Sequence, residues 1–322
     1  MDRRTARRIG RRLLEIGLTL LGVAVLVFVT LRVLPGDQIT ASLGIESGDM
    51  SDAQIAALRA YYGMDQPLHL QFLSWLGSVL TGNLGYDQDT GQSVLDMTLS
   101  ALPITFELAV LSTLVGLAIG IPLALLSASK PDGARDAVAQ TVGLAALAIP
   151  SFLLGSLLIA YVSKWFRYNP NSLAFARLTD DPWLNLQQLL FPAIVLGFGL
   201  AAPIMRTART ALLEVQAQDF VRTARGKGVS PGRIRTRHVL RAALIPIVTM
   251  TGIQFGYLLG GAIVVEQIFS VPGLGRQVLL GIQQKEFAVV QSTVLVIALL
   301  FVLVNIATDW VYRIVDPRVR AT

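Results

Sequence analysis

The sequence predicts an all-α, polytopic membrane protein with six transmembrane helices. The composition is the first reason, because 53% of the 322 residues are hydrophobic and only 15% are charged, whereas an average soluble chain carries about 25% charged residues. The second is that the hydrophobic residues gather in six runs, each of a length that crosses a bilayer as a helix. The third is the unequal sharing of Lys and Arg between alternate connections, which is typical of membrane proteins.

The first run covers residues 13–34 and follows six arginines within the first 12 residues. A cleaved signal peptide begins similarly, but 22 residues is long for its apolar core and no small-x-small site follows before Pro35. We therefore expect a retained first helix. The other spans are expected at residues 101–128, 137–163, 186–205, 242–265 and 287–311. Prolines interrupt several of them, which membrane helices tolerate with bends; these are Pro103, Pro122, Pro150, Pro192, Pro203 and Pro246.

The charges predict the orientation of the spans. Six spans place both termini on one side, and 20 of the 27 Lys and Arg residues fall on that side. Because cytoplasmic connections are enriched in Lys and Arg, we expect cytoplasmic N- and C-termini. Residues 36–100 contain eight acidic residues and, among Lys and Arg, only Arg59. They predict a small extracytoplasmic subdomain with a helix-like piece at residues 51–62 and an aromatic-bearing piece at residues 71–80.

A basic amphipathic segment, residues 206–241, separates two of the membrane-length runs. Its apolar residues recur at the spacing of one helix face; they are Leu213, Ala217, Phe220, Val221 and Ala224. Gly228 ends this helix, and Ser230 to Gly232 turns the chain. We expect one helix over residues 213–228 whose apolar stripe has no apolar neighbour in its own chain. The alternative is a basic loop that acts only as a topology signal.

Within this segment, FVRTARGKG followed by RHVLRAALIP resembles the cytoplasmic coupling loop of ABC importer permeases of the dipeptide/oligopeptide branch. The general permease pattern is Glu-Ala-Ala, then three residues, then Gly. This chain departs from it, with Arg222-Thr223-Ala224 ahead of Gly228. The departure fits the dipeptide/oligopeptide branch. Three more stretches resemble the same permeases in the same order: YGMDQPLHLQFLSWLGSVLTGNLGY, VVEQIFSVPGLGRQVL with Glu266 at the membrane edge, and WVYRIVDPRVR. Together the four matches cover most of the chain.

The resemblance implies a type I ABC importer permease in the bacterial cytoplasmic (inner) membrane. Residues 1–100 would be an N-terminal segment with the first helix and extracytoplasmic loop, residues 101–309 the permease core, and residues 310–322 a cytoplasmic tail. Residues 206–241 would dock on an ATPase; the implied coupling residues are Leu213, Ala217, Asp219, Phe220, Val221, Thr223, Ala224 and Gly228.

The resemblance also implies the partners and the mechanism. A second homologous permease, two cytoplasmic ATPases that bind ATP and Mg, and an extracytoplasmic solute-binding protein would complete the importer, which moves its substrate by alternating access. Di- or oligopeptides are the expected substrates. Permeases of this branch also serve nickel, glutathione, sugars and opines, so the sequence leaves the substrate open.

Other chemistry is not expected from this chain. The phosphate-binding loop of an ATPase ends in Gly-Lys-Ser/Thr, but the only Gly-Lys here, Gly226-Lys227, is followed by Gly228. With no cysteine and two histidines, a metal site or a cofactor of its own is not expected. Ser127 and Lys130 match Ser-x-x-Lys without its companion motifs, which leaves an intramembrane hydrolase as a rival hypothesis.

Small and polar residues within the spans suggest packing and path positions. Gly252, Gly256 and Gly260 share one face of the fifth span, and Gly116 and Gly120 do so in the second. Such faces allow close helix packing, within the chain or with a partner permease. Gln254 and Asn305 are candidates for the substrate path, or they bond neighbouring helices. Glu107 and Asp309 leave open a rival class, a secondary transporter or channel that uses intramembrane carboxylates.

Overall fold

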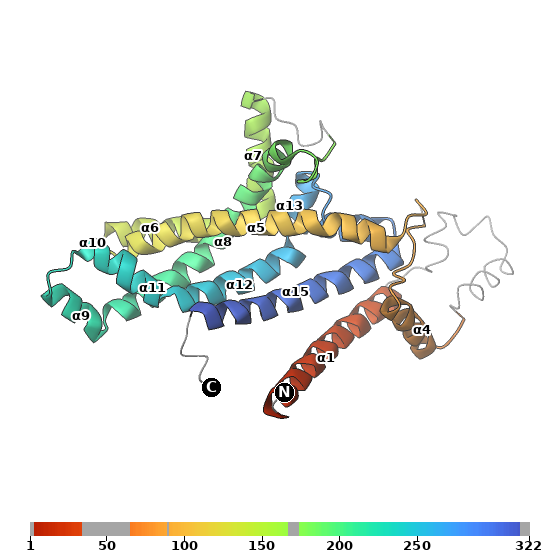
Figure 1. Ribbon diagram of the computed structural model, residues 1–322. Helices are drawn as coiled ribbons and strands as arrows, with labels where there is room; N and C mark the ends of the chain where they lie inside the picture. Colours follow the sequence, from red (N-terminus) through yellow and green to blue (C-terminus); the bar gives the residue numbers. More distant parts are fainter. Residues whose placement is uncertain (1–2, 34–64, 89, 167–173, 316–322) are drawn as a thin grey trace. The chain divides into compact units, whose positions relative to one another are not determined.

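The computed structural model describes residues 3–33, 65–88, 90–166 and 174–315 (Figure 1). In these ranges the chain is helical, and its β-structure is a single antiparallel bridge between Tyr86 and Ser93. Four helices are long and apolar enough to cross a membrane, or six if each of two bent helix pairs is one span. The predicted all-α membrane fold is therefore confirmed. The helical piece expected at residues 51–62 lies outside the described residues.

The helices fall into two compact units, Met1–Pro103 with Gly273–Val302 and Ile104–Pro272 with Leu303–Thr322. In chain order the described helices are α1 (Arg3–Val33), α4 (Leu68–Leu80), α5 (Val94–Ser127), α6 (Ala134–Ala148), α7 (Ser151–Phe166), α8 (Pro182–Gln216), α9 (Asp219–Gly226), α10 (Pro231–Arg233), the π-helix η1 (Ile234–Val239), α11 (Leu240–Ala242), α12 (Leu244–Gly261), α13 (Ile263–Ile268), α14 (Leu274–Gln283) and α15 (Phe287–Val315).

The third predicted span, residues 137–163, is not one straight helix. It consists of α6 and α7, which are bent by 94° relative to each other. Pro150 lies at the break, and the preceding Ile149 has extended backbone angles, φ −85° and ψ 116°. A residue before proline is sterically pushed out of the α region, so α6 ends there. The segment leading into the fifth span is also bent, by 58° between residues 231–242 and 244–260.

The second unit is centred on α8, which packs against α6, α7 and α12 (Figure 1). Glycines allow α5 to approach α8 closely: a Cβ added to Gly120 would lie 2.8 Å from the carbonyl oxygen of Ala201, and one added to Gly116 would lie 2.9 Å from Leu200 Cβ. The Gly116 and Gly120 face therefore packs within the chain.

In the first unit α1 packs against α4, which contains the aromatic-bearing piece at residues 71–80. The rings of Phe28 and Phe72 meet edge to face at 5.2 Å. The Arg32 guanidinium lies 3.8 Å from the centre of the Phe28 ring, and Arg32 Nε donates a hydrogen bond of 3.1 Å to Gln71 Oε1. Aromatic and cation–π contacts thus fix α4 beside the C-terminal end of the first span.

Candidate coupling site

The basic segment begins where α8 ends, and it is not the single helix that the spacing predicts. α8 continues to Gln216, Ala217 caps it, and Gln218 takes extended backbone angles, φ −76° and ψ 151°, before α9 starts at Asp219. Leu213 and Ala217 therefore belong to α8 and its cap. The apolar spacing runs on across this break, and no Gly or Pro marks it, so periodicity alone did not show it.

The inner side of α9 is held by Val221, whose side chain is completely buried. It belongs to a hydrophobic cluster that α5, α8, η1 and α12 share; the cluster includes Ala124, Ala128, Met205, Leu212, Val215, Ile234, Val239 and Ile247. Leu213 and Ala224 are partly buried against the same cluster. The expectation that the apolar stripe has no apolar neighbour in its own chain is therefore wrong, because Val221 and Ala224 pack in this hydrophobic cluster of the second unit.

The outer side of α9 carries one large apolar residue among charges. Phe220 is 43% exposed, although its neighbour Val221 points inward. Arg222, Thr223 and Arg225 are exposed as well. Arg222 Nη1 lies 3.7 Å from the Asp219 carboxylate, a contact between side chains that are 80% and 96% exposed. Such an exposed ion pair adds little stability. The outer side of α9 therefore exposes an aromatic ring and charged side chains.

The chain returns to the membrane through a turn and a π-helix. Gly228 has a positive φ of +78°, which glycine adopts readily, and the amide of Val229 donates to the carbonyl oxygen of Ala224. In η1, Ile234 and Val239 are both buried in the cluster, five residues apart. The wider π-turn, with i to i+5 bonding, brings this spacing onto one side. η1 thus contributes two side chains to the cluster in which Val221 of α9 is buried.

A polar network lies beside this cluster and joins three helices. Arg209 of α8 places Nη2 2.6 Å from Asp136 Oδ2 and Nε 3.0 Å from Asp136 Oδ1. Ser127, at the end of α5, donates to Asp136 Oδ1 at 2.6 Å and accepts from Arg209 Nε at 2.8 Å. The amide of Asp132 and the side chain of Gln140 also donate to Asp136. These bonds satisfy a carboxylate that is only 1% exposed.

The network accounts for Ser127, which the sequence raised as a nucleophile. Its hydroxyl is engaged by Asp136 and Arg209, whereas Lys130 is exposed. A serine–lysine pair needs the lysine as the base at the hydroxyl, so the geometry favours a structural role for Ser127. Among the residues that the structure describes, no group of three or more His, Cys, Asp and Glu is placed to hold a metal ion.

Two family models match the chain. Residues 120–321 match the family described as "Binding-protein-dependent transport system inner membrane component", and residues 6–109 match the N-terminal component of these membrane proteins. The chain belongs to this family. It is therefore the permease component of a binding-protein-dependent ABC importer, an inner-membrane protein, and ATP hydrolysis is carried out by separate ATPase subunits.

Two relatives match the permease over nearly all of its length. The glutathione transport system permease protein GsiC of Salmonella typhi is 37% identical over 315 residues, which are 96% of this chain and 97% of the relative. A putative peptide permease protein of Brucella ovis, BOV_A0351, is 35% identical over 314 residues, covering 97% and 98% of the two chains. These similarities support the dipeptide/oligopeptide branch and do not favour a secondary transporter.

A solved structure shows the same fold. The permease matches a chain of the inward-facing MetNI methionine ABC transporter with a TM-score of 0.54 at 20% identity, over 68% of this chain and 96% of that chain. The permease therefore has the ABC importer permease fold that the resemblance predicted.

The path residues expected from the sequence lie on α12 and α15 of the permease. Gln254 is half-buried, Asn305 is exposed, and the side chain of Asp309 lies outside the described residues. Glu107 accepts a hydrogen bond of 3.1 Å from Asn185 Nδ2. The assignment of Gln254 and Asn305 to the substrate path stays a prediction.

The three glycines on one face of the fifth span lie in different environments. Gly252 meets the side chain of Thr308 on α15, Gly256 is buried, and Gly260 is exposed. Gly252 thus packs within the chain, as one of the two alternatives expected. Glu266, expected at a membrane edge, is completely buried and accepts a 2.8 Å hydrogen bond from Thr105 Oγ1; a buried carboxylate in this position was not foreseen.

Proposed function

We propose that the permease forms half of the translocation path of an ATP-driven importer for di- or oligopeptides, glutathione included. The observation that carries the substrate class is the similarity, at 35% to 37% identity over nearly the whole chain, to permeases named for glutathione and for peptides. Glutathione is itself a tripeptide, so both names describe short chains with amide bonds and a terminal carboxylate. A second, homologous permease and an extracytoplasmic solute-binding protein complete the path.

α9 is the element through which the two ATPases move this permease. Its two-sided structure supports that role: Val221 and Ala224 fix α9 to the core of its own unit, while Phe220, Asp219 and Thr223 are directed outward. A groove on an ATPase would take the Phe220 ring. When the ATPases bind ATP and Mg and close, α9 would carry their movement into α8, and the spans would alternate between inward-open and outward-open states.

This mechanism requires α9 and both termini to lie in the cytoplasm. The distribution of Lys and Arg supports that orientation. The chain has no cysteine, so Ser230→Cys and Gln66→Cys each give one labelling position, both at exposed residues. A membrane-impermeant thiol reagent should label Gln66→Cys in intact cells, and Ser230→Cys only after the membrane is opened. The reverse pattern would refute the orientation.

Transport in reconstituted vesicles tests the function. The permease pair, its ATPases and the solute-binding protein are reconstituted, and uptake of radiolabelled glutathione and of a dipeptide is measured. We expect uptake that requires both ATP and the binding protein and that stops with ATPases unable to hydrolyse ATP. Uptake driven by a proton or sodium gradient without ATP would refute the importer. ATP-dependent uptake of nickel or a sugar, but not of peptides, would refute the substrate class alone.

A further inference from the structure

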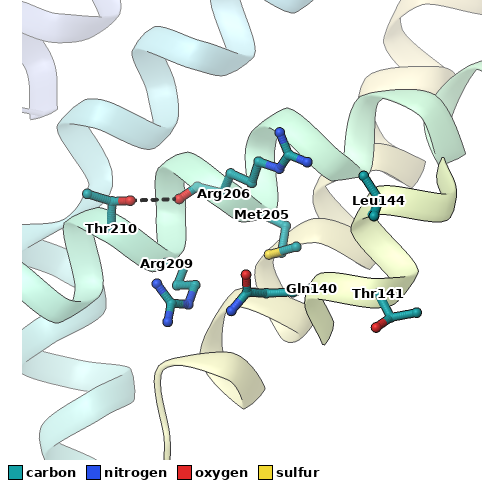
Figure 2. Close-up of a pocket in the computed structure, with 7 residues that line it drawn as sticks. All are labelled: Gln140, Thr141, Leu144, Met205, Arg206, Arg209 and Thr210. Atoms are coloured by element: carbon teal, nitrogen blue, oxygen red, sulfur yellow. Dashed lines mark hydrogen bonds between the residues drawn. The ribbon is translucent and has the colours of Figure 1, made fainter. Parts of the chain in front are cut away.

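An open pocket of about 420 Å³ lies between α6 and α8, beside the polar network but separate from the outer side of α9. Figure 2 shows its two walls, with Gln140, Thr141 and Leu144 on one helix and Met205, Arg206 and Arg209 on the other. Thr210 donates to the carbonyl oxygen of Arg206 one turn earlier and completes the second wall. The volume falls in the range of small-molecule pockets and far exceeds that of a water molecule.

The charge of the pocket favours an anion. No Asp or Glu lines it. The guanidinium of Arg209 is neutralised by Asp136 at 2.6 Å. Arg206 is exposed and, within the described part of the chain, forms no ion pair. One positive charge, that of Arg206, is therefore uncompensated at the pocket. The hydroxyl of Thr141 on the other wall can donate a hydrogen bond. An unpaired guanidinium that lines a pocket suits a phosphate group.

The rest of the pocket is apolar and opens onto a surface that favours hydrocarbon. Leu144 and Met205 line it, and Leu144 is 58% exposed. Leu147, almost one turn further along the same helix, is exposed too. In a chain that spans a membrane, exposed leucines on one side of a helix are placed to contact acyl chains. A ligand that fits both parts has an anionic head and an apolar body.

We propose that this pocket binds the phosphate of an anionic phospholipid, with Arg206 as the charged contact and the acyl chains along Leu144 and the outer face of α6. Basic pockets between membrane helices at the cytoplasmic side are suited to such headgroups. The site would hold a lipid beside the network of Ser127, Asp136 and Arg209, and so beside the helix that leads to α9. This inference does not depend on which solute the importer moves.

The test uses the assembled importer in its detergent-purified, delipidated form. Native mass spectrometry measures the binding of phosphatidylglycerol and of phosphatidylcholine to the parent and to three variants. Arg206→Gln removes the charge, Arg206→Lys retains it, and Arg135→Gln removes a charge from an exposed residue of α6 outside the pocket. We expect Arg206→Gln to lose about five-fold in its preference for phosphatidylglycerol, while Arg206→Lys and Arg135→Gln remain close to the parent.

Three results would overturn the proposal. Equal lipid preference in the parent and Arg206→Gln would remove Arg206 from any lipid site. Displacement of phosphatidylglycerol by millimolar inorganic phosphate would assign the pocket to a soluble anion instead. A disulfide between Leu144→Cys and a cysteine placed in the second permease, formed in the assembled importer, would show that a protein covers the pocket.

Discussion

Phe220 is the residue whose replacement separates docking on an ATPase from folding of the permease. Its side chain is 43% exposed in the isolated chain. An aromatic side chain offers about 200 Å², so about 90 Å² of this ring remains for a partner to cover. At about 25 cal/mol per Å², covering it contributes at most about 2 kcal/mol. Phe220→Ala should therefore weaken ATPase binding by up to about 30-fold, and it should leave the fold of the permease intact.

The assay titrates the ATPase subunits onto the permease pair in lipid nanodiscs and records the thermal unfolding midpoint of each variant. Val221→Ala is the matched control, because the adjacent Val221 is completely buried. It deletes two carbon atoms from the cluster and should cost about 1.5 to 3 kcal/mol of stability. If Phe220→Ala bound the ATPases like the parent but unfolded at a lower temperature, the ring would be part of the chain's own core and the docking argument would fail.

Two further substitutions test the contacts that join the helices of the second unit. Asp136→Asn should lower the unfolding midpoint by roughly 5 °C, because it leaves the Arg209 guanidinium without its carboxylate. Adding Arg209→Gln to this variant should restore part of the loss. An unchanged midpoint in Asp136→Asn would mean that the network does not join the helices. Gly120→Ala should cost about 1 to 3 kcal/mol, since its Cβ would lie 2.8 Å from the Ala201 oxygen, whereas Gly199→Ala, with nothing within 4 Å of its Cβ, should be close to neutral. Equal unfolding midpoints for the two alanine variants would contradict close packing of α5 on α8.

The positions of the spans could be predicted because the bilayer imposes a length and a composition on each of them. Residues 101–128 and 186–205 correspond to α5 and α8 in this way. The sharp bend between α6 and α7 could not be predicted from hydropathy. Pro150 is one of six prolines in the spans, and α8 contains Pro192 and Pro203 without ending. Whether a proline bends or ends a helix depends on what satisfies the freed backbone groups, which is decided by neighbouring helices.

A helix was predicted within the basic segment, but its start was not. Phe220 and Val221 are adjacent and both fit a helical stripe within the spacing of the expected helix. The direction of each became clear only once the break at Gln218 set the start of α9. The π-helix was also missed, because its spacing from Ile234 to Val239 belongs to neither the α nor the β period.

The polar network could not be read from the sequence, because its partners are far apart along the chain. Arg209 lies 73 residues from Asp136 and 82 from Ser127. The only hint was an acidic residue just after one membrane exit and an arginine just after another. Pairing them requires knowing that α6 and α8 are neighbours, which is a property of the fold.

The central claim is that the outer side of α9 meets an ATPase, and a cross-link at Phe220 tests it most directly. Because the chain has no cysteine, Phe220→Cys places one thiol on that surface. The importer is assembled with ATPases that carry cysteines around their membrane-facing groove, and a short bismaleimide is added. We predict an adduct with the mass of one permease and one ATPase subunit, absent when the thiol is placed at Gln66 instead. An adduct with the solute-binding protein, or none with any ATPase, would contradict the account.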